Sequence, residues 1–204
     1  QRGSSLPWHK DYTRPALLDF FLPARDSHAA AYYDWGTDTE TQWKENYRLW
    51  MAFVNEYKNR GGRVTAGADS GYMYNLYGFG YIQELELLRE AGFHPMEVIQ
   101  SATLNAAEAI GMNDLIGTIE VGKLADMILM DQNPLKNLKY LYGTGDIKLN
   151  ETNEVVRVGG VNYTIKDGII YDARQLLEDV KKIVDEEKEA TPNWESLMIQ
   201  SIDR

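Results

Sequence analysis

The chain has 204 residues, of which 44% are hydrophobic and 25% charged, a composition typical of globular rather than disordered proteins. The formal net charge of −10 argues against a nucleic-acid partner, and the absence of cysteine excludes disulfides and thiolate metal sites. No apolar run approaches the roughly 20 residues that cross a bilayer, so no membrane partner is expected. The compartment stays open between cytoplasm and periplasm.

Residues 1–36 are rich in aromatic, proline and small polar residues. This composition predicts a loop that holds one short helix around Pro15 to Phe21. The first residue is Gln1 instead of methionine, so we expect the chain to be the tail of a longer protein, although processing would give the same start.

The next segment carries large apolar side chains at helical intervals, at Trp43, Tyr47, Trp50, Val54 and Tyr57. The spacing predicts a helix that begins near Thr37 and ends at the glycine pair Gly61 and Gly62. A stripe of this kind normally packs in a core, and we expect it to do so here.

A short run of small residues, "RVTAGAD" at 63–69, predicts a buried strand that ends at Asp69. A carboxylate at this point either holds a metal ion or caps a turn. A single buried strand cannot form a parallel sheet alone, so its neighbours must come from elsewhere. The following stretches, 81–93 and 94–111, predict two helices, the first stopped by Gly92 and the second with Pro95 in its first turn.

From Ile116 onward the periodicity changes from helix to strand. The apolar run at 124–131 predicts a strand, and the alternating residues 161–172 predict a hairpin around an Asp-Gly turn. An amphipathic helix is expected from about Asp172, and the charged run "DEEKE" after its apolar side is expected to be solvated.

Three stretches together carry a resemblance to a known family: "TAGADSG", "ATLNAAEAIGM" and "IGTIEVGKLADMILMDQNPL". They resemble the C-terminal part of metal-dependent amidohydrolases, nearest to the imidazolonepropionase-like and Xaa-Pro-dipeptidase-like branch. The resemblance implies an α/β fold, the C-terminal part of a (β/α)8 barrel with part of a small composite β domain. The expected parts are residues 1–115 in the barrel, 116–172 in the β domain, and 173–204 as a C-terminal helix and tail.

In this family the aspartate at the end of the eighth strand binds the metal and moves a proton during hydrolysis, and it maps onto Asp69. The expected cofactor is a divalent metal ion, with zinc as the expected metal. The family's other ligands, a His-x-His pair, a lysine or glutamate and further histidines, lie on earlier strands. This chain has only His9, His28 and His94, none at such spacing. We therefore expect that the chain alone neither holds zinc tightly nor turns over substrate.

Four further residues are candidates for substrate binding: Ser70, Tyr72, Tyr74 and His9. The alternative is a packed loop for the first three and plain polar surface for His9. His94, which precedes Pro95, is better explained by helix capping. By the resemblance, Lys123, Ala125 and Asp126 mark the fold and have no catalytic role.

The leading hypothesis is therefore a C-terminal fragment of a hydrolase that cleaves C–N bonds in an amide, a cyclic amide or a dipeptide. Its partner would be a small molecule or a short peptide. One alternative is a non-catalytic protein that keeps the fold and binds itself or a partner; another is one subunit of a split hydrolase. A partial barrel leaves apolar faces uncovered, so a homo-oligomer is expected.

Overall fold

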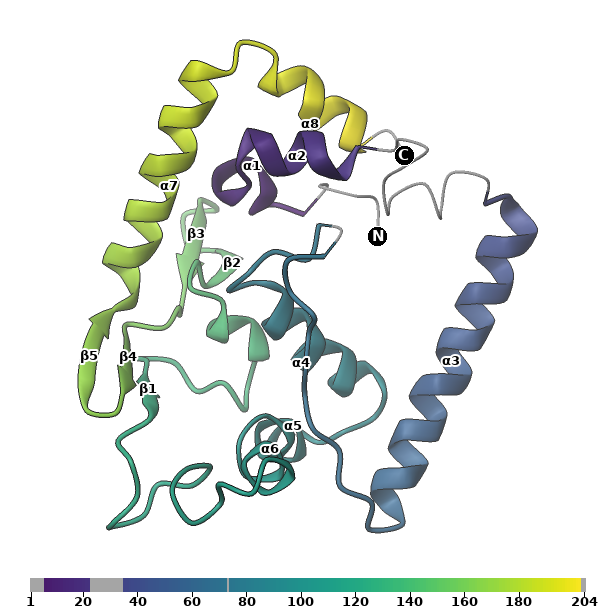
Figure 1. Ribbon diagram of the computed structural model, residues 1–204, viewed down its shortest axis with the longest axis vertical. Coiled ribbons are helices and arrows are strands. Elements are labelled where there is room, and N and C mark those ends of the chain that lie inside the picture. The colour runs from purple at the N-terminus through teal and green to yellow at the C-terminus, as the bar shows by residue number, and fades with distance from the viewer. Residues whose placement is uncertain (1–5, 23–34, 73, 203–204) are drawn as a thin grey trace. The chain divides into compact units, whose positions relative to one another are not determined.

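The computed structural model describes residues 6–22, 35–72 and 74–202, and Figure 1 shows the course of the chain. The chain divides into two compact units. The first unit combines Gln1–Trp43, Asp69–Tyr77 and Leu177–Arg204, and the second combines Lys44–Ala68 with Gly78–Leu176. Each unit is therefore assembled from segments that lie far apart in the sequence.

The described helices are, in chain order, α1 (His9–Tyr12), α2 (Pro15–Phe21), α3 (Thr37–Asn59), α4 (Gly80–Glu90), α5 (Pro95–Ala102), α6 (Leu104–Ala109), the 3₁₀ helix η2 (Leu138–Leu141), α7 (Ala173–Ala190) and α8 (Trp194–Ile202). The described strands are β1 (Met127–Leu129), β2 (Asp146–Leu149), β3 (Val155–Val158), β4 (Tyr163–Lys166) and β5 (Ile169–Asp172). None of the described helices has a segment both long and apolar enough to cross a membrane.

The first unit is built around α2 and α8, which lie side by side in Figure 1. Leu18 of α2 packs with Leu197 and Met198 of α8 in a small buried cluster. The guanidinium of Arg14 donates two hydrogen bonds, of 2.8 and 2.9 Å, from Nε to the carboxylate of Glu187. Residues near the two ends of the chain thus form one core.

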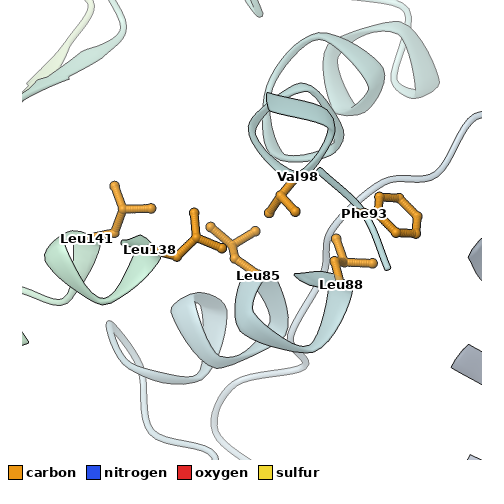
Figure 2. Packing of buried hydrophobic residues seen from close by; sticks show 6 residues of the cluster. All are labelled: Leu85, Leu88, Phe93, Val98, Leu138 and Leu141. Carbon is orange, nitrogen blue, oxygen red and sulfur yellow. The ribbon is translucent and has the colours of Figure 1, made fainter. Parts of the chain in front are cut away.

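The second unit has its core between α4, α5 and η2. Figure 2 shows Leu85 and Leu88 on α4, with Val98 of α5 on one side and Leu138 of η2 on another. Phe93 follows α4 and is fully buried in the same cluster. The apolar periodicity of these short segments is therefore explained by one shared core.

Two small antiparallel sheets complete the second unit. One has the strand order β1-β4-β5, and the other pairs β2 with β3. The turn between β4 and β5 has φ of 50° at Asp167 and 79° at Gly168, which is the geometry of a type I′ turn. The hairpin predicted around this Asp-Gly pair is confirmed.

Several other predicted elements form with the expected bounds. Helix α2 spans Pro15–Phe21, α3 ends before the glycine pair, and α7 begins directly after Asp172. The carboxylate of Asp172 caps α7, because its Oδ1 accepts the amide protons of Arg174 and Gln175 at 3.0 and 3.1 Å. The mixed helix and strand composition agrees with the predicted α/β class.

Other expectations differ from the structure. None of residues 62–69 is paired in a strand, because no neighbouring strand offers them a ladder. The single helix expected over 94–111 is divided at Thr103, whose backbone (φ −126°, ψ −88°) is not helical. The hairpin of β2 and β3 and the helix α8 were not expected.

The aromatic stripe on α3 is also not packed as expected. No residue of α3 is buried, and five aromatic side chains on it expose between 44% and 66% of their surface: Trp43, Tyr47, Trp50, Phe53 and Tyr57. Val54 alone among the predicted stripe packs against the core of the second unit. The expectation of a core-packed stripe is therefore wrong for most of its members.

Candidate functional site

The segment that leads to Asp69 is extended although it is unpaired. Within the second unit, Val64 and Ala66 pack against the core, and Thr65 between them is exposed. The amide of Ala66 donates to the carbonyl of Ser101 at 3.2 Å. The side-chain amide of Asn105 donates to the carbonyl of Val64 at 2.9 Å. Helices α5 and α6 thus satisfy backbone groups of this segment.

Asn105 was not recognised from the sequence as important for the site. It lies in the helix α6 within the "TLNAAEA" stretch, where the neighbouring residues are small and apolar. The signal was therefore a single polar residue among alanines, directed toward a backbone carbonyl. Its hydrogen bond holds the extended segment that precedes Asp69.

Asp69 is exposed, and its backbone has φ of 46°, in the left-handed region. Aspartate is one of the few residues other than glycine that adopts this region at modest cost. Within the part of the chain that the structure describes, its carboxylate forms no hydrogen bond and no ion pair. Both carboxylate oxygens are therefore available to an external ligand.

The residues after Asp69 form a tight turn within the first unit. The amide of Gly71 donates to the carbonyl of Asn75 at 2.7 Å, and the amide of Asn75 donates to the carbonyl of Tyr72 at 2.9 Å. Ser70 is half-buried, and Tyr72 exposes 43% of its surface. These two predicted substrate residues therefore have surface that a ligand can reach.

Tyr74 and His9 are brought together, but inside the first unit. Their ring centroids are 6.1 Å apart and the ring planes stand at 89°, an edge-on contact. The hydroxyl of Tyr74 donates to the carbonyl of Phe21 at 3.2 Å. Neither residue contacts the side chain of Asp69 by any hydrogen bond among the described residues.

His9 is fully buried, and its Nδ1 lies 2.9 Å from the hydroxyl of Thr13, which is also buried. Its Nε2 has no hydrogen-bond partner among the described residues. Burial lowers the pKa of His9 from 6.5 to about 4, because desolvation disfavours the charged imidazolium. The ring is therefore neutral at physiological pH.

The other two histidines contribute no ligand set. His94 occupies the N-cap position of α5, and its amide donates to the carboxylate of Glu97 at 2.7 Å, as the capping interpretation predicted. His28 lies outside the described residues. No group of three or more histidine, aspartate or glutamate side chains among the described residues is arranged to hold a metal ion.

The predicted fold markers have structural contacts. Lys123 donates to the carbonyl of Asn113 at 2.7 Å and forms a hydrogen bond with Thr118. Asp126 pairs with Lys166, and its Oδ1 accepts the amide proton of Asp167 at 2.7 Å. Both residues fasten loops of the second unit, and these two contacts lower the pKa of Asp126. Their absence from catalysis stays a prediction.

The amino-acid sequence has relatives among known proteins. Residues 50–170 match the model of the Amidohydrolase family. A curated imidazolonepropionase from Geobacillus sp. (strain WCH70) is 40% identical over 79 residues, which cover 39% of this chain and 17% of the relative. The chain thus spans less than a fifth of the length of that relative.

Two solved structures are also similar. A Xaa-Pro dipeptidase with methionine bound in its active site is 26% identical, with a TM-score of 0.44, over 63% of this chain and 25% of that chain. An uncharacterized protein is 19% identical, with a TM-score of 0.50, over 78% of this chain and 34% of that chain. The second likeness concerns the fold alone.

Proposed function

Because the chain belongs to the Amidohydrolase family, we propose that it is the C-terminal part of a metal-dependent hydrolase that cleaves C–N bonds. The observation that carries this proposal is the exposed carboxylate of Asp69, which has no partner among the described residues and directly follows an extended segment. Both oxygens of such a carboxylate contact only solvent, so both can accept a ligand. The substrate would be an amide, a cyclic amide or a short peptide.

The proposed fold is the last portion of a (β/α)8 barrel. In this proposal residues 63–69 become the eighth strand once neighbouring strands are supplied. Exposure alternates along Val64, Thr65 and Ala66, and the backbone is extended. Both are properties of a β-strand, so they support this proposal. Asp69 then lies at the carboxyl end of the strand, where such barrels place their active sites.

The donor chemistry of Asp69 fits a divalent cation, since carboxylate oxygens bind both zinc and harder ions. A divalent ion, with zinc expected, supplies Lewis-acid polarisation of the substrate carbonyl when it is bound. Asp69 accepts a proton from the attacking water and returns it to the leaving amine, the role of a general acid–base. Ser70 and Tyr72 are proposed to contact the substrate, since both have accessible surface.

Tight binding requires ligands beyond Asp69, because isolated carboxylates bind divalent ions weakly. The described residues provide no cluster of three or more metal ligands. We therefore propose that this chain alone is inactive and binds a divalent cation only weakly. A split hydrolase, in which another subunit supplies the histidines, is compatible with the same chemistry.

One observation favours a different class of function. Five aromatic side chains of α3 are exposed, and large exposed apolar surfaces commonly bind another protein. A non-catalytic protein that binds another copy of itself through this helix is therefore the second candidate. Oligomerisation is expected in both cases, and metal binding separates them.

The proposal is tested by titrating Mn²⁺ into the ¹⁵N-labelled chain and measuring paramagnetic broadening of the amide signals. We expect broadening centred on Asp69 and Ser70, lost in Asp69→Asn and retained in Glu151→Gln, which changes another exposed carboxylate. Asparagine keeps the backbone preference for positive φ, so the fold is retained.

The possible results separate the candidates clearly. Absence of broadening at Asp69 would contradict its role as a metal ligand and favour the non-catalytic alternative. Stoichiometric zinc in the purified chain, measured by elemental analysis, would instead contradict the expectation that the other ligands lie outside it.

A further inference from the structure

Tyr74 is the residue that joins the turn after Asp69 to the helices of the first unit. Its ring packs against Phe21 at a centroid distance of 5.2 Å, and its hydroxyl donates to the Phe21 carbonyl at 3.2 Å. The same side chain packs against the cluster of Leu18, Leu197 and Met198. Tyr74 is therefore held by both a polar and an apolar contact.

His9 supports Tyr74 from α1. Its ring meets Tyr74 edge-on, and it is itself held by the 2.9 Å hydrogen bond between Nδ1 and Thr13. Because His9 is fully buried, its ring has no surface with which to touch a substrate. His9 can instead support the ring of Tyr74, a role that does not require access to solvent.

The turn connects Tyr74 to Asp69 and is held by its own backbone hydrogen bonds. Two backbone hydrogen bonds, from the amide of Gly71 to the carbonyl of Asn75 at 2.7 Å and from the amide of Asn75 to the carbonyl of Tyr72 at 2.9 Å, tie Gly71 and Tyr72 to Asn75. Asp69 and Tyr74 both have positive φ, 46° and 59°. A positive φ is unusual for a bulky residue such as Tyr74, so the contacts of its side chain help to hold this conformation.

We infer that Tyr74 is a positioning residue for Asp69, with His9 as its support, rather than a contact for the substrate. The Tyr74 anchor fixes the turn, and the turn fixes the direction of the Asp69 carboxylate. A fixed carboxylate is needed for catalysis, since a displacement of about 1 Å costs on the order of a hundredfold in rate. The inference rests on the proposed function, because it assumes that Asp69 is the working group.

The test compares Tyr74→Phe, Tyr74→Leu and Leu197→Val in the full chain without added metal. The first variant removes only the hydroxyl, and the second also removes the aromatic contacts with Phe21 and His9. The third trims the same apolar cluster but leaves Tyr74 intact, so it controls for a general loss of stability. Amide hydrogen exchange is measured at Gly71 and Asn75, with Thr191, which follows α7 in the same unit, as the reference amide.

We expect Tyr74→Phe to accelerate exchange at Gly71 and Asn75 about fivefold relative to Thr191, the loss expected for one hydrogen bond. Tyr74→Leu should accelerate it more and lower the ¹⁵N order parameter of Asp69 below that of rigid backbone, about 0.85. Leu197→Val should change all three amides by the same factor. Unchanged turn amides in Tyr74→Leu, or equal changes at Thr191, would overturn the inference.

A second readout separates this inference from the proposed function. In Tyr74→Leu, Mn²⁺ should broaden Asp69 and Ser70 less than in the original chain at the same folded fraction, and Tyr74→Phe should restore most of the broadening. Equal broadening in all three proteins would contradict the positioning role and leave Asp69 as a ligand. Faster turn exchange in a chain whose Asp69 shows no broadening would support the anchor and contradict the proposed function.

Discussion

A single residue, Asp69, combines a left-handed backbone with an exposed carboxylate that has no partner among the described residues. A turn alone would be satisfied by glycine or asparagine at this position. The backbone requirement and the chemical requirement can therefore be separated by substitution, because each tolerates a different set of side chains.

We predict that Asp69→Asn leaves the free energy of unfolding within about 0.5 kcal/mol of the original, because asparagine also tolerates positive φ. Asp69→Val should lower it by roughly 1–2 kcal/mol, because a β-branched residue is strained at this φ. Urea denaturation measures both. Equal stability of the two variants would mean that the left-handed conformation is not maintained in solution.

His9 provides a prediction on pH. Its pKa is lowered from 6.5 to about 4, so between these values the unfolded chain binds a proton that the folded chain does not. The free energy of unfolding should therefore fall as the pH falls from about 6.5 to about 4, by at most about 3 kcal/mol from this residue.

The measurement compares urea unfolding of the original chain and His9→Asn across this pH range. Carboxylates titrate in both proteins, so their contribution cancels in the difference. The variant should lose less stability on acidification than the original chain. Parallel pH profiles would contradict a neutral, buried His9.

At the scale of elements, turn chemistry determined the hairpin of β4 and β5. Gly168 has φ of 79° and open space around the position of a Cβ atom, so an added methyl group would meet only backbone strain. Gly67 also has open space, but its φ is not in the left-handed region. Alanine substitutions at the two glycines therefore differ mainly in backbone strain, and each serves as a control for the other.

We predict that Gly168→Ala lowers the free energy of unfolding by about 1 kcal/mol, the cost of placing alanine in the left-handed region. Gly67→Ala should be neutral or slightly stabilising, since it only reduces the freedom of the unfolded chain. Chemical denaturation of both variants, followed by circular dichroism, gives the comparison. A destabilised Gly67→Ala would contradict the open space around the Cβ position of Gly67.

The core element of the second unit gives another prediction. Leu85 is 2% exposed between α5 and η2, so Leu85→Ala should cost about 2–5 kcal/mol through lost contacts and a cavity. Ile119 is 85% exposed, and Ile119→Ala should change stability by less than about 0.5 kcal/mol. Equal effects, again by chemical denaturation, would mean that the Leu85 cluster is not the core.

Elements governed by local signals were predictable from the sequence, and elements governed by distant partners were not. Proline at the first turn of α2 and the Asp-Gly turn carry their own backbone preferences. Residues 63–69 need a neighbouring strand, and the described chain supplies none. The predicted helix is divided at Thr103, whose hydroxyl donates to the carbonyl of Ile99 at 2.8 Å, a local contact that spacing alone does not reveal.

The candidate site was predictable to a similar extent. Asp69 was predicted from a motif, and the structure shows it exposed with no partner among the described residues. The burial of His9 could not be predicted, because its ring contacts Tyr74, which lies far away in the sequence. The hydrogen bond from Asn105 to Val64 joins residues 41 positions apart and was missed for the same reason.

At the scale of the whole molecule, the exposed aromatic side of α3 should govern association. We predict that the chain forms a dimer or larger species, and that Trp50→Lys shifts it toward monomer by placing a charge on this apolar surface. Arg48→Glu is the control, since it lies about 160° away around the helix. Light scattering after size-exclusion chromatography gives the mass. A monomeric original chain would contradict the prediction.

The first unit consists of three separate segments of the chain, and this affects the order of folding during translation. Arg14 and Glu187 are 173 positions apart, so their contact must wait until most of the chain has been synthesised. Residues 78–176 form the larger part of the second unit and can begin to fold earlier, since N-terminal segments emerge first. The turn that carries Asp69 belongs to the first unit, so a nascent chain presents that carboxylate in its final setting only after Leu177–Arg204 has been synthesised.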